Sequence, residues 1–186
     1  MALEQNRSVA SIVRVFFPPA IGLLLFAAAI YAVVLPRTHD IVLSQQEAGV
    51  EELSSVVIQT LDTYRALAQA GVITGEQARA AALSGVRQIR YGVGDREYFW
   101  INDLHPYLLM HPYRPDLEGT DVSNYRDPQG TRVFVEMVEA VRESGAGYVE
   151  YLWQWHDDES LIVPKRSYVR LFEPWGWVVG TGIYLQ

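Results

Sequence analysis

The sequence predicts an α+β fold in which a long N-terminal helix packs on a five-stranded antiparallel sheet, with one transmembrane helix before it. Three observations lead to this prediction. An uncharged apolar run comes first, an amphipathic helical pattern follows it, and segments of alternating aromatic and aliphatic residues dominate the chain after Gly92. We expect the helices to cover one face of the sheet, which leaves the other face for loops or a ligand.

The apolar run, residues 15–35, is long enough to cross a bilayer. It contains 21 residues without a charge, and a helix of that length reaches about 31 Å. Two arginines precede the run, and one arginine and one aspartate follow it. This weak positive bias predicts a cytoplasmic N-terminus over 1–14 and an extracytoplasmic domain over 36–186. The expected location is therefore the inner (plasma) membrane, single-pass, with the domain in the periplasm or outside the cell.

Two other interpretations of this run stay open at this stage, a cleaved signal peptide and a buried core helix. Small residues at Ala27, Ala28 and Ala29 offer a cleavage site. The apolar run continues through Leu35, further than a signal peptide requires, and this favours an uncleaved anchor.

Composition excludes several classes of function. The chain has 186 residues, 15 Lys and Arg against 22 Asp and Glu, and a net charge of −7. It has no basic cluster that could follow a phosphate backbone, so nucleic acid is not an expected partner. The absence of cysteine removes disulfides, thiolate metal sites and cysteine nucleophiles.

Two helices are expected before the sheet. Apolar residues recur at helical spacing from His39 to about Gln69. Thr74 followed by Gln77 is typical of a capping box, which predicts a second helix to about Ile89.

The sheet is expected from five alternating segments with one helix among them. The helix is predicted to start at Asp127 and Pro128 and to end near Gly145. The polar segment 113–126 is long for a loop without regular structure, and loops of that length often act as lids. The predicted strands are YFWIN (98–102), YLLMH (107–111), GYVEYLWQW (147–155), SYVRLF (167–172) and VVGTGIYL (178–185).

The ordered motifs in this part of the chain resemble a known family. The resemblance extends over about residues 35–185, and the family is the single Cache domain of type 2, an extracytoplasmic sensor module of bacterial chemoreceptors and sensor histidine kinases. The motifs are YFWIND (98–103), MHP (110–112), LxxTD (117–121), DxxG (127–130), YxW (151–153), PKRSY (164–168) and FxPWGWVVGTG (172–182).

The resemblance implies a sheet related to the Per-Arnt-Sim (PAS) fold and a small-molecule pocket between the sheet and its loops. Family members commonly bind small carboxylates such as acetate, propionate, pyruvate or lactate, and they serve chemotaxis or signal transduction. They usually continue into a second membrane helix and a cytoplasmic signalling domain, whereas the printed sequence ends at Gln186. The output is therefore expected from the rest of a longer receptor or from a partner protein.

Lys165 and His111 are the first candidates for contacting a carboxylate. A buried anion needs charge-assisted donors. The family motif places a basic residue at Lys165, which is the expected counter-charge, and His111 is the expected hydrogen-bond donor. Judged from the residues alone, a strand-end lysine is the favoured interpretation of Lys165, and a structural histidine is the favoured interpretation of His111.

Aromatic residues are expected to form the walls of the pocket. By strand alternation, Phe99 and Ile101 should face the helices, so that Tyr98 and Trp100 face the pocket. Core packing is the alternative for every wall residue. The complete set of expected ligand-binding residues is Tyr98, Trp100, Met110, His111, Tyr151, Trp153, Lys165 and Tyr168.

Arg114 is the expected lid residue and an alternative counter-charge, because it begins the long loop. No metal site, cofactor or catalytic residue is predicted: the acidic residues lie in expected turns, and no motif of a hydrolase, phosphate-binding loop or zinc protease is present.

The sequence therefore predicts a membrane-tethered sensor domain for a small organic ligand, expected to be a C2–C4 carboxylate. The apolar stripe on Thr38–Gln69 suits a two-fold partner helix, so a homodimer or a signalling-receptor partner is expected. Three alternatives stay open: a ligand-independent interaction or regulatory subunit, a solute-binding protein released into the periplasm, and a small hydrolase or metalloenzyme.

Overall fold

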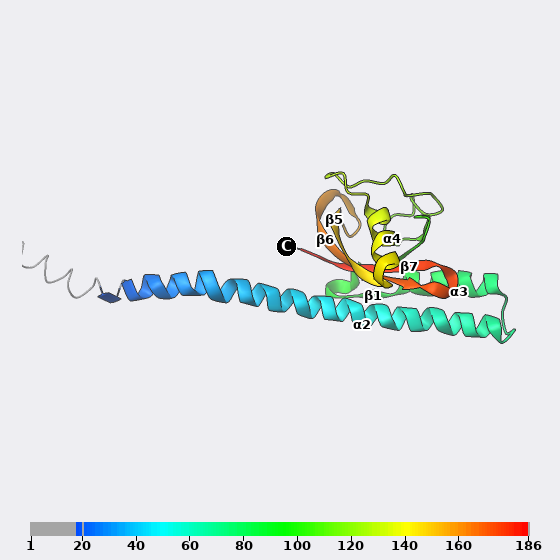
Figure 1. The fold of residues 1–186 in the computed structure, drawn as a ribbon, viewed down its shortest axis with the longest axis horizontal. Coiled ribbons are helices and arrows are strands. Elements are labelled where there is room, and N and C mark those ends of the chain that lie inside the picture. The colour runs from blue at the N-terminus through cyan, green and yellow to red at the C-terminus, as the bar shows by residue number, and fades with distance from the viewer. Residues whose placement is uncertain (1–17, 20, 186) are drawn as a thin grey trace, which may run out of the picture. The chain divides into compact units, whose positions relative to one another are not determined.

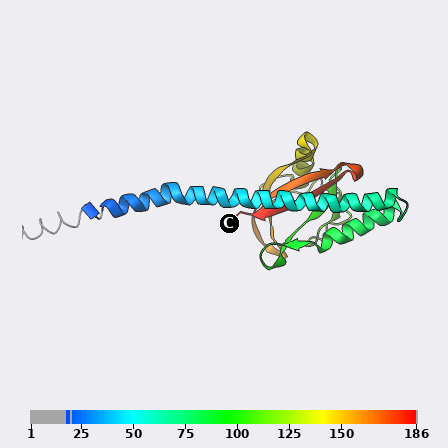
Figure 2. The same cartoon turned by 90° about the horizontal axis from the view of Figure 1, so that it is seen from below.

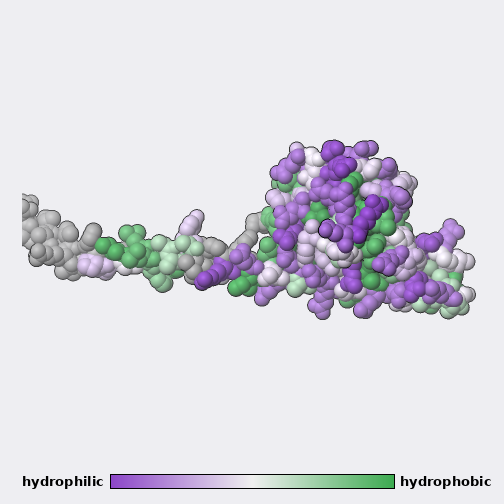
Figure 3. All heavy atoms as spheres, in the orientation of Figure 1, coloured by the Kyte–Doolittle hydropathy of each residue, from purple (hydrophilic) through white to green (hydrophobic). Residues whose placement is uncertain are grey.

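The computed structural model describes residues 18–19 and 21–185 and divides into two compact units, one up to residue 45 and one from residue 46 onward. In the first unit, residues 21–29 are helical and lead through a π-helical turn, η1 (Ile30–Val34), into helix α2 (Leu35–Gln69). Large apolar side chains are exposed there, with Leu23 at 71% and Phe26 at 65%, and they form a green stretch in Figure 3.

The predicted transmembrane segment stays a prediction. Residues 15–17 and 20 of the predicted span 15–35, and the whole predicted cytoplasmic segment 1–14, lie outside the described residues. Among residues 18–19 and 21–185, no helix combines the length and the apolar character needed to cross a membrane.

In the second unit, the rest of α2 and helix α3 (Gly75–Gln88) form an antiparallel pair (Figures 1 and 2). The predicted capping box at the start of α3 is confirmed. The Thr74 hydroxyl accepts a hydrogen bond from the Gln77 N–H at 3.1 Å, and the Gln77 side chain accepts one from the Thr74 N–H at 2.8 Å. Both bonds satisfy backbone groups that a helix end would otherwise leave unpaired.

The predicted five-stranded antiparallel sheet is confirmed in the described part of the chain. Its strand order is β4-β3-β7-β6-β5, so the last strand in the sequence, β7, lies in the centre. The strands are β3 (Trp100–Asp103), β4 (Leu108–Met110), β5 (Ala146–Trp155), β6 (Asp158–Phe172) and β7 (Trp177–Tyr184). Short 3₁₀ turns, η2 (Val93–Asp95) and η3 (Glu173–Trp175), precede the short strand β2 (Glu97–Tyr98) and β7, respectively.

Three elements differ from the sequence-based prediction. The YFWIN segment is divided, because Tyr98 belongs to β2 (Glu97–Tyr98), which pairs with β1 (Arg90–Tyr91) in a separate two-stranded sheet. Strand β6 begins at Asp158, well before the predicted start, because the whole of β5 pairs with it. Helix α4 (Val133–Ser144) begins six residues after Asp127, whose carboxylate organises a loop instead of capping the helix.

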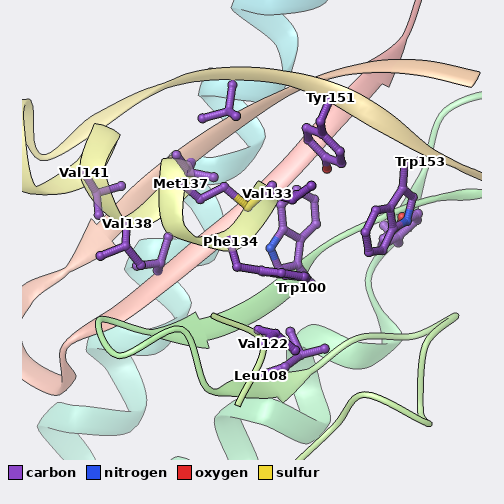
Figure 4. Packing of buried hydrophobic residues seen from close by; sticks show 14 residues of the cluster. Trp100, Leu108, Val122, Val133, Phe134, Met137, Val138, Val141, Tyr151 and Trp153 are labelled. Atoms are coloured by element: carbon purple, nitrogen blue, oxygen red, sulfur yellow. The ribbon is translucent and has the colours of Figure 1, made fainter. Parts of the chain in front are cut away.

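The two faces of the sheet carry separate cores. Phe99 and Ile101 pack with Leu61 of α2 and Val86 of α3, whereas Tyr98 and Trp100 pack on the opposite face with residues of α4 (Figures 1 and 4). The predicted alternation of YFWIN is thus confirmed. The expectation that all helices cover one face was wrong, because the apolar stripe of α4 closes part of the second face. That stripe is Val133, Phe134, Met137, Val138 and Val141.

Candidate functional site

Strand β6 directs alternate side chains to opposite faces of the sheet. Lys165, Ser167 and Val169 are buried, at 1%, 0% and 0% exposure; Val169 packs in the α4-side core and Ser167 bonds to Tyr151 of the same core. Arg166 and Arg170 lie on the opposite face and point to α2, where the Arg166 Nε lies 2.9 Å from the Glu47 Oε1 and Arg170 donates a hydrogen bond to the Ser55 hydroxyl. This alternation brings a lysine into an aromatic core.

Lys165 is surrounded by aromatic rings. Its Nζ donates a hydrogen bond of 2.9 Å to the Tyr98 hydroxyl. The same atom lies 4.1 Å from the ring centroid of Tyr98, 4.6 Å from that of Tyr184 and 5.4 Å from that of Trp100. No carboxylate of the described residues forms a salt bridge with it. Burial lowers the pKa of Lys165 to about 7, and the charge of Glu97 opposes this shift.

His111 lies at the same place, immediately after β4. It is 1% exposed, and its ring centroid is 4.9 Å from Tyr98 and 5.6 Å from Trp153. Its Nδ1 accepts a hydrogen bond from the Tyr113 N–H at 3.2 Å, which places the ring proton of the neutral form on Nε2. Burial, followed by the charges of Lys165 and Arg114, holds the pKa of His111 well below its usual value. The ring is therefore a neutral donor near pH 7.

Two tryptophans and a tyrosine complete this group, which we call the Lys165 cluster. The Tyr151 hydroxyl pairs with Ser167 Oγ at 2.9 Å. In the part of the chain that the structure describes, the buried indole N–H groups of Trp100 and Trp153 find no hydrogen-bond acceptor of good geometry. Figure 4 shows Trp100 and Tyr151 on the face of the sheet that carries α4. The cluster consists of Tyr98, Trp100, His111, Tyr151, Trp153 and Lys165.

Arg114 covers the cluster from the long loop. Its guanidinium lies 5.9 Å from the Trp153 ring centroid and 5.8 Å from that of Tyr125. Two hydrogen bonds of 2.8 and 2.7 Å fix it to the Asp116 carboxylate. Because Asp116 already neutralises Arg114, Lys165 is the cation of the cluster that lacks a carboxylate partner among the described residues.

The chemistry of the cluster suits a small anion. An ammonium group, a neutral imidazole N–H and two indole N–H groups are all donors on buried side chains. The two indole N–H groups lack an acceptor of good geometry among the described residues, which costs free energy, and an anion with two oxygens could accept hydrogen bonds from several of these donors at once. Among the described residues, no group of three His, Asp or Glu side chains is arranged as a metal site.

The comparisons with known proteins agree with this fold. A family model described as "Single Cache domain 2" matches residues 42–186. This chain belongs to the single Cache domain 2 family. The resemblance inferred from the sequence motifs is confirmed over nearly the same residues.

Several relatives of this Cache domain are sensors. Methyl-accepting chemotaxis protein McpP of Pseudomonas putida is 46% identical over 134 residues, which is 70% of this chain and 24% of McpP. A solved periplasmic sensor domain of a chemotaxis protein is 44% identical, has a TM-score of 0.73, and is matched over 77% of this chain and 98% of that domain. A solved Cache chemosensory domain described for its recognition of carboxylic acids is 40% identical, with a TM-score of 0.74 and coverages of 80% and 99%. The chain spans 19–30% of the length of the curated relatives it matches.

Two residues expected in the ligand site lie elsewhere in the Cache domain. Met110 packs in the α2- and α3-side core, because the pairing of β3 with β4 shifts register at Ile101 and pairs Met110 with Ile101. Tyr168 faces α2, because it alternates with Lys165 and Ser167 on β6, and its ring lies 5.1 Å from Tyr148. Both expectations are therefore corrected.

Sequence reasoning also missed residues that shape the cluster. Tyr184 pairs with Lys165 across β6 and β7 and presents its ring to the ammonium group. Gly180 lies under Trp100 so closely that a Cβ atom there would collide with the indole ring. The only signal for these residues was their place in the final aromatic and glycine-rich strand, and that signal does not reveal cross-strand partners.

Proposed function

We propose that this chain is the extracytoplasmic sensor domain of a membrane receptor and binds a small organic anion, a C2–C4 carboxylate, at the Lys165 cluster. One observation carries the proposal: a fully buried lysine that lacks a carboxylate partner among the described residues and lies among other buried donors. A carboxylate there would supply the missing charge, and the ring faces would enclose its few carbon atoms.

The relatives support this proposal. A 40% identical Cache domain is described for carboxylic acid recognition, and a 46% identical relative is a chemotaxis receptor. Because the chain spans only part of such receptors, we propose chemotaxis or signal transduction as the role of the longer protein. Binding without catalysis is the role that we propose for the cluster itself.

We also propose that residues 15–35 anchor the chain in the inner membrane. The exposed apolar side chains of residues 21–31 support an anchor, because such a surface is unfavourable in water. Deleting residues 1–35 should move the protein from the membrane pellet to the soluble fraction. Retention of the truncated chain in the pellet would contradict this part of the proposal.

Thermal unfolding in the presence of candidate ligands tests the binding role. We expect one of acetate, propionate, pyruvate or lactate to raise the Tm at pH 6.5. A ligand at about 100 times its Kd adds about 2.7 kcal/mol, which corresponds to several degrees for a domain of this size. Amino acids and amines in the same panel test other ligand classes.

Two variants make this experiment specific. Lys165→Met keeps the side-chain volume, and it should fold, because it replaces a buried charge with an apolar group. It should lose the ligand-induced shift. Arg65→Met also removes one positive charge, but Arg65 pairs with Asp62 on the surface of α2, and this variant should keep the shift. If no compound shifts the wild type, a ligand-independent interaction subunit becomes the better account.

A further inference from the structure

The chain uses lysine at only one position. Fourteen of its 15 basic Lys and Arg residues are arginine, and the single lysine is Lys165. Arginine keeps its charge even when it is buried, whereas lysine can release its proton. Among the described residues, the one Lys or Arg side chain that the fold buries almost completely is thus the one that is able to become neutral.

The surroundings of Lys165 favour its neutral form. The Tyr98 hydroxyl accepts its hydrogen bond and three ring faces surround it, but no carboxylate of the described residues lies within 4.0 Å of its Nζ. Glu97 is the carboxylate that acts on it through its charge, from the neighbouring strand β2. The Glu97 Oε1 lies 3.8 Å from His156 Nε2, and its Oε2 is buried without a hydrogen bond.

The pKa values are consistent with this geometry. Burial lowers the pKa of Lys165 to about 7 and also raises the pKa of Glu97, so both groups are less charged than they would be in water. The aromatic hydroxyls stay protonated, because burial raises their pKa values further. The titratable and charged groups that face Lys165 or act on this site include Glu97 and Tyr98 of β2, Arg96 just before β2, Tyr184 of β7, Tyr151 of β5, Arg87 of α3, His111, Arg114 and Asp116 after β4, and His156 between β5 and β6.

We propose that Lys165 loses its charge in the empty site as the pH rises above neutral, and that carboxylate binding is then coupled to the uptake of one proton by its Nζ. The proton comes from the solvent, the ligand binds as an anion, and the bound pair is an ammonium carboxylate. This inference rests on the proposed function and adds that the sensor responds to pH as well as to its ligand.

Because anion binding is coupled to protonation of Lys165, the direction in which the Kd changes with pH can be stated. The bound anion stabilises the protonated lysine, so its pKa is higher in the complex than in the empty site. Below the pKa of the empty site the affinity should be constant. Above it, the Kd should increase about tenfold for each pH unit, because a smaller fraction of the empty sites carries the proton.

The empty site can be examined without any ligand. Lysine labelled with ¹³C and ¹⁵N in the 186-residue chain, held in detergent micelles, should give one side-chain signal, because Lys165 is the only lysine. We expect its chemical shifts to titrate near pH 7. Glu97→Gln should lower the midpoint, because it removes the carboxylate charge that favours the ammonium form of Lys165. A midpoint near 10 in the empty wild-type chain overturns the proposal.

Calorimetry then measures proton uptake directly. Acetate, propionate, pyruvate and lactate are titrated into the same chain at pH 6 and pH 8.5, in two buffers whose ionisation enthalpies differ. For the carboxylate that binds, we expect close to one proton taken up per ligand at pH 8.5 and little uptake at pH 6. The Kd should rise at least tenfold between these pH values.

Two variants identify the group that takes up the proton. Lys165→Arg holds a permanent charge, so any binding it retains should show no proton uptake at pH 8.5; uptake that persists in this variant would assign the proton to another group, such as His111, and overturn the proposal. Glu97→Gln removes the charge that supports the ammonium form of Lys165, so the Kd of this variant should begin to rise at a lower pH.

Two results in the wild type distinguish failure of the inference from failure of the proposed function. Ligand binding without proton uptake at pH 8.5 overturns only the coupling of binding to protonation. Absence of binding at pH 6 contradicts the proposed function itself.

Discussion

Asp127 is a single residue that connects the long loop to the sheet. Its carboxylate accepts hydrogen bonds of 2.9 Å from the backbone N–H groups of Gln129, Thr131 and Leu152. Burial alone would raise its pKa, but these three donors outweigh burial and hold the pKa below its usual value. The ionised carboxylate therefore stabilises the folded state above pH 4, and this contribution is lost as the pH falls through the lowered pKa.

We predict that Asp127→Ala lowers the free energy of unfolding by about 3 kcal/mol, because it leaves several backbone donors without an acceptor. Urea unfolding at pH 7 measures this loss. Asp127→Asn keeps one acceptor oxygen and should lose less. Both variants should lose less stability relative to wild type at pH 3 than at pH 7, and an equal loss at both pH values would contradict the role of the charge.

Gly180 provides the flat surface on which Trp100 lies. A Cβ atom at this position would overlap the indole ring, which is itself packed in the core. We predict that Gly180→Ala costs about 1–3 kcal/mol through overpacking and weakens carboxylate binding, because it displaces Trp100. Gly49→Ala on α2 is the matched control, since nothing lies within 4 Å of the Cβ position there. The control should be neutral or stabilising.

The sequence allowed some residues of the Lys165 cluster to be selected, but not every side chain to be placed on the correct face of the sheet. Lys165 and His111 could be selected because a familiar motif marks them, and the structure brings both to one place with Tyr98, Trp100, Tyr151 and Trp153. Met110 and Tyr168 could not be placed, because their side depends on a register shift and on the phase of a strand. Neither property is encoded in a local pattern.

At the scale of elements, strand β6 connects the Lys165 cluster to helix α2. Lys165 faces the cluster, and the next residue, Arg166, lies 2.9 Å from Glu47 of α2 and 3.0 Å from Glu150 of β5. On the neighbouring strand, the Tyr148 hydroxyl donates to Glu51 of α2 at 2.9 Å. A shift of β6 on ligand binding would therefore change the contacts of α2.

We predict that Arg166 and Glu47 are coupled by at most about 1 kcal/mol, because both side chains are partly exposed and solvent screens the pair. A double-mutant cycle with Arg166→Gln and Glu47→Gln measures this energy from urea unfolding. If α2 reports ligand binding through this pair, the coupling energy should change when a saturating carboxylate is added. The same coupling energy with and without ligand would exclude this route.

The elements themselves were largely predictable. The stripes of α2 and α4 and the capping box of α3 follow from helical spacing, and the strands follow from alternation. The division of YFWIN between β2 and β3, and the long pairing of β6 with β5, depend on partners that are distant in sequence. The late start of α4 follows from Asp127, which binds backbone groups of the loop and of β5 instead of capping a helix.

At the scale of the whole molecule, the buried lysine should be visible in the pH dependence of stability. The pKa of Lys165 is about 7 in the folded state and about 10.4 in an unfolded chain. Between these values the unfolded chain binds the proton that the folded chain lacks, so this residue makes the free energy of unfolding rise with pH.

We predict that the stability of the wild type relative to Lys165→Met increases between pH 7 and pH 9, by at most about 1.4 kcal/mol per pH unit. Urea unfolding of both chains at several pH values gives the difference, and the comparison cancels the contributions of all other titrating groups that the substitution leaves unchanged. A difference that stays constant with pH would mean that Lys165 remains charged in the folded state.

Equilibrium dialysis of radiolabelled acetate, propionate, pyruvate and lactate at pH 6.5 measures whether a small carboxylate binds at Lys165. We expect saturable binding of at least one of these ligands, with one site per chain in the wild type and in Arg65→Met. That site should be lost in Lys165→Met. Equal binding by Lys165→Met, or no saturable binding by the folded wild type, would contradict carboxylate binding at Lys165.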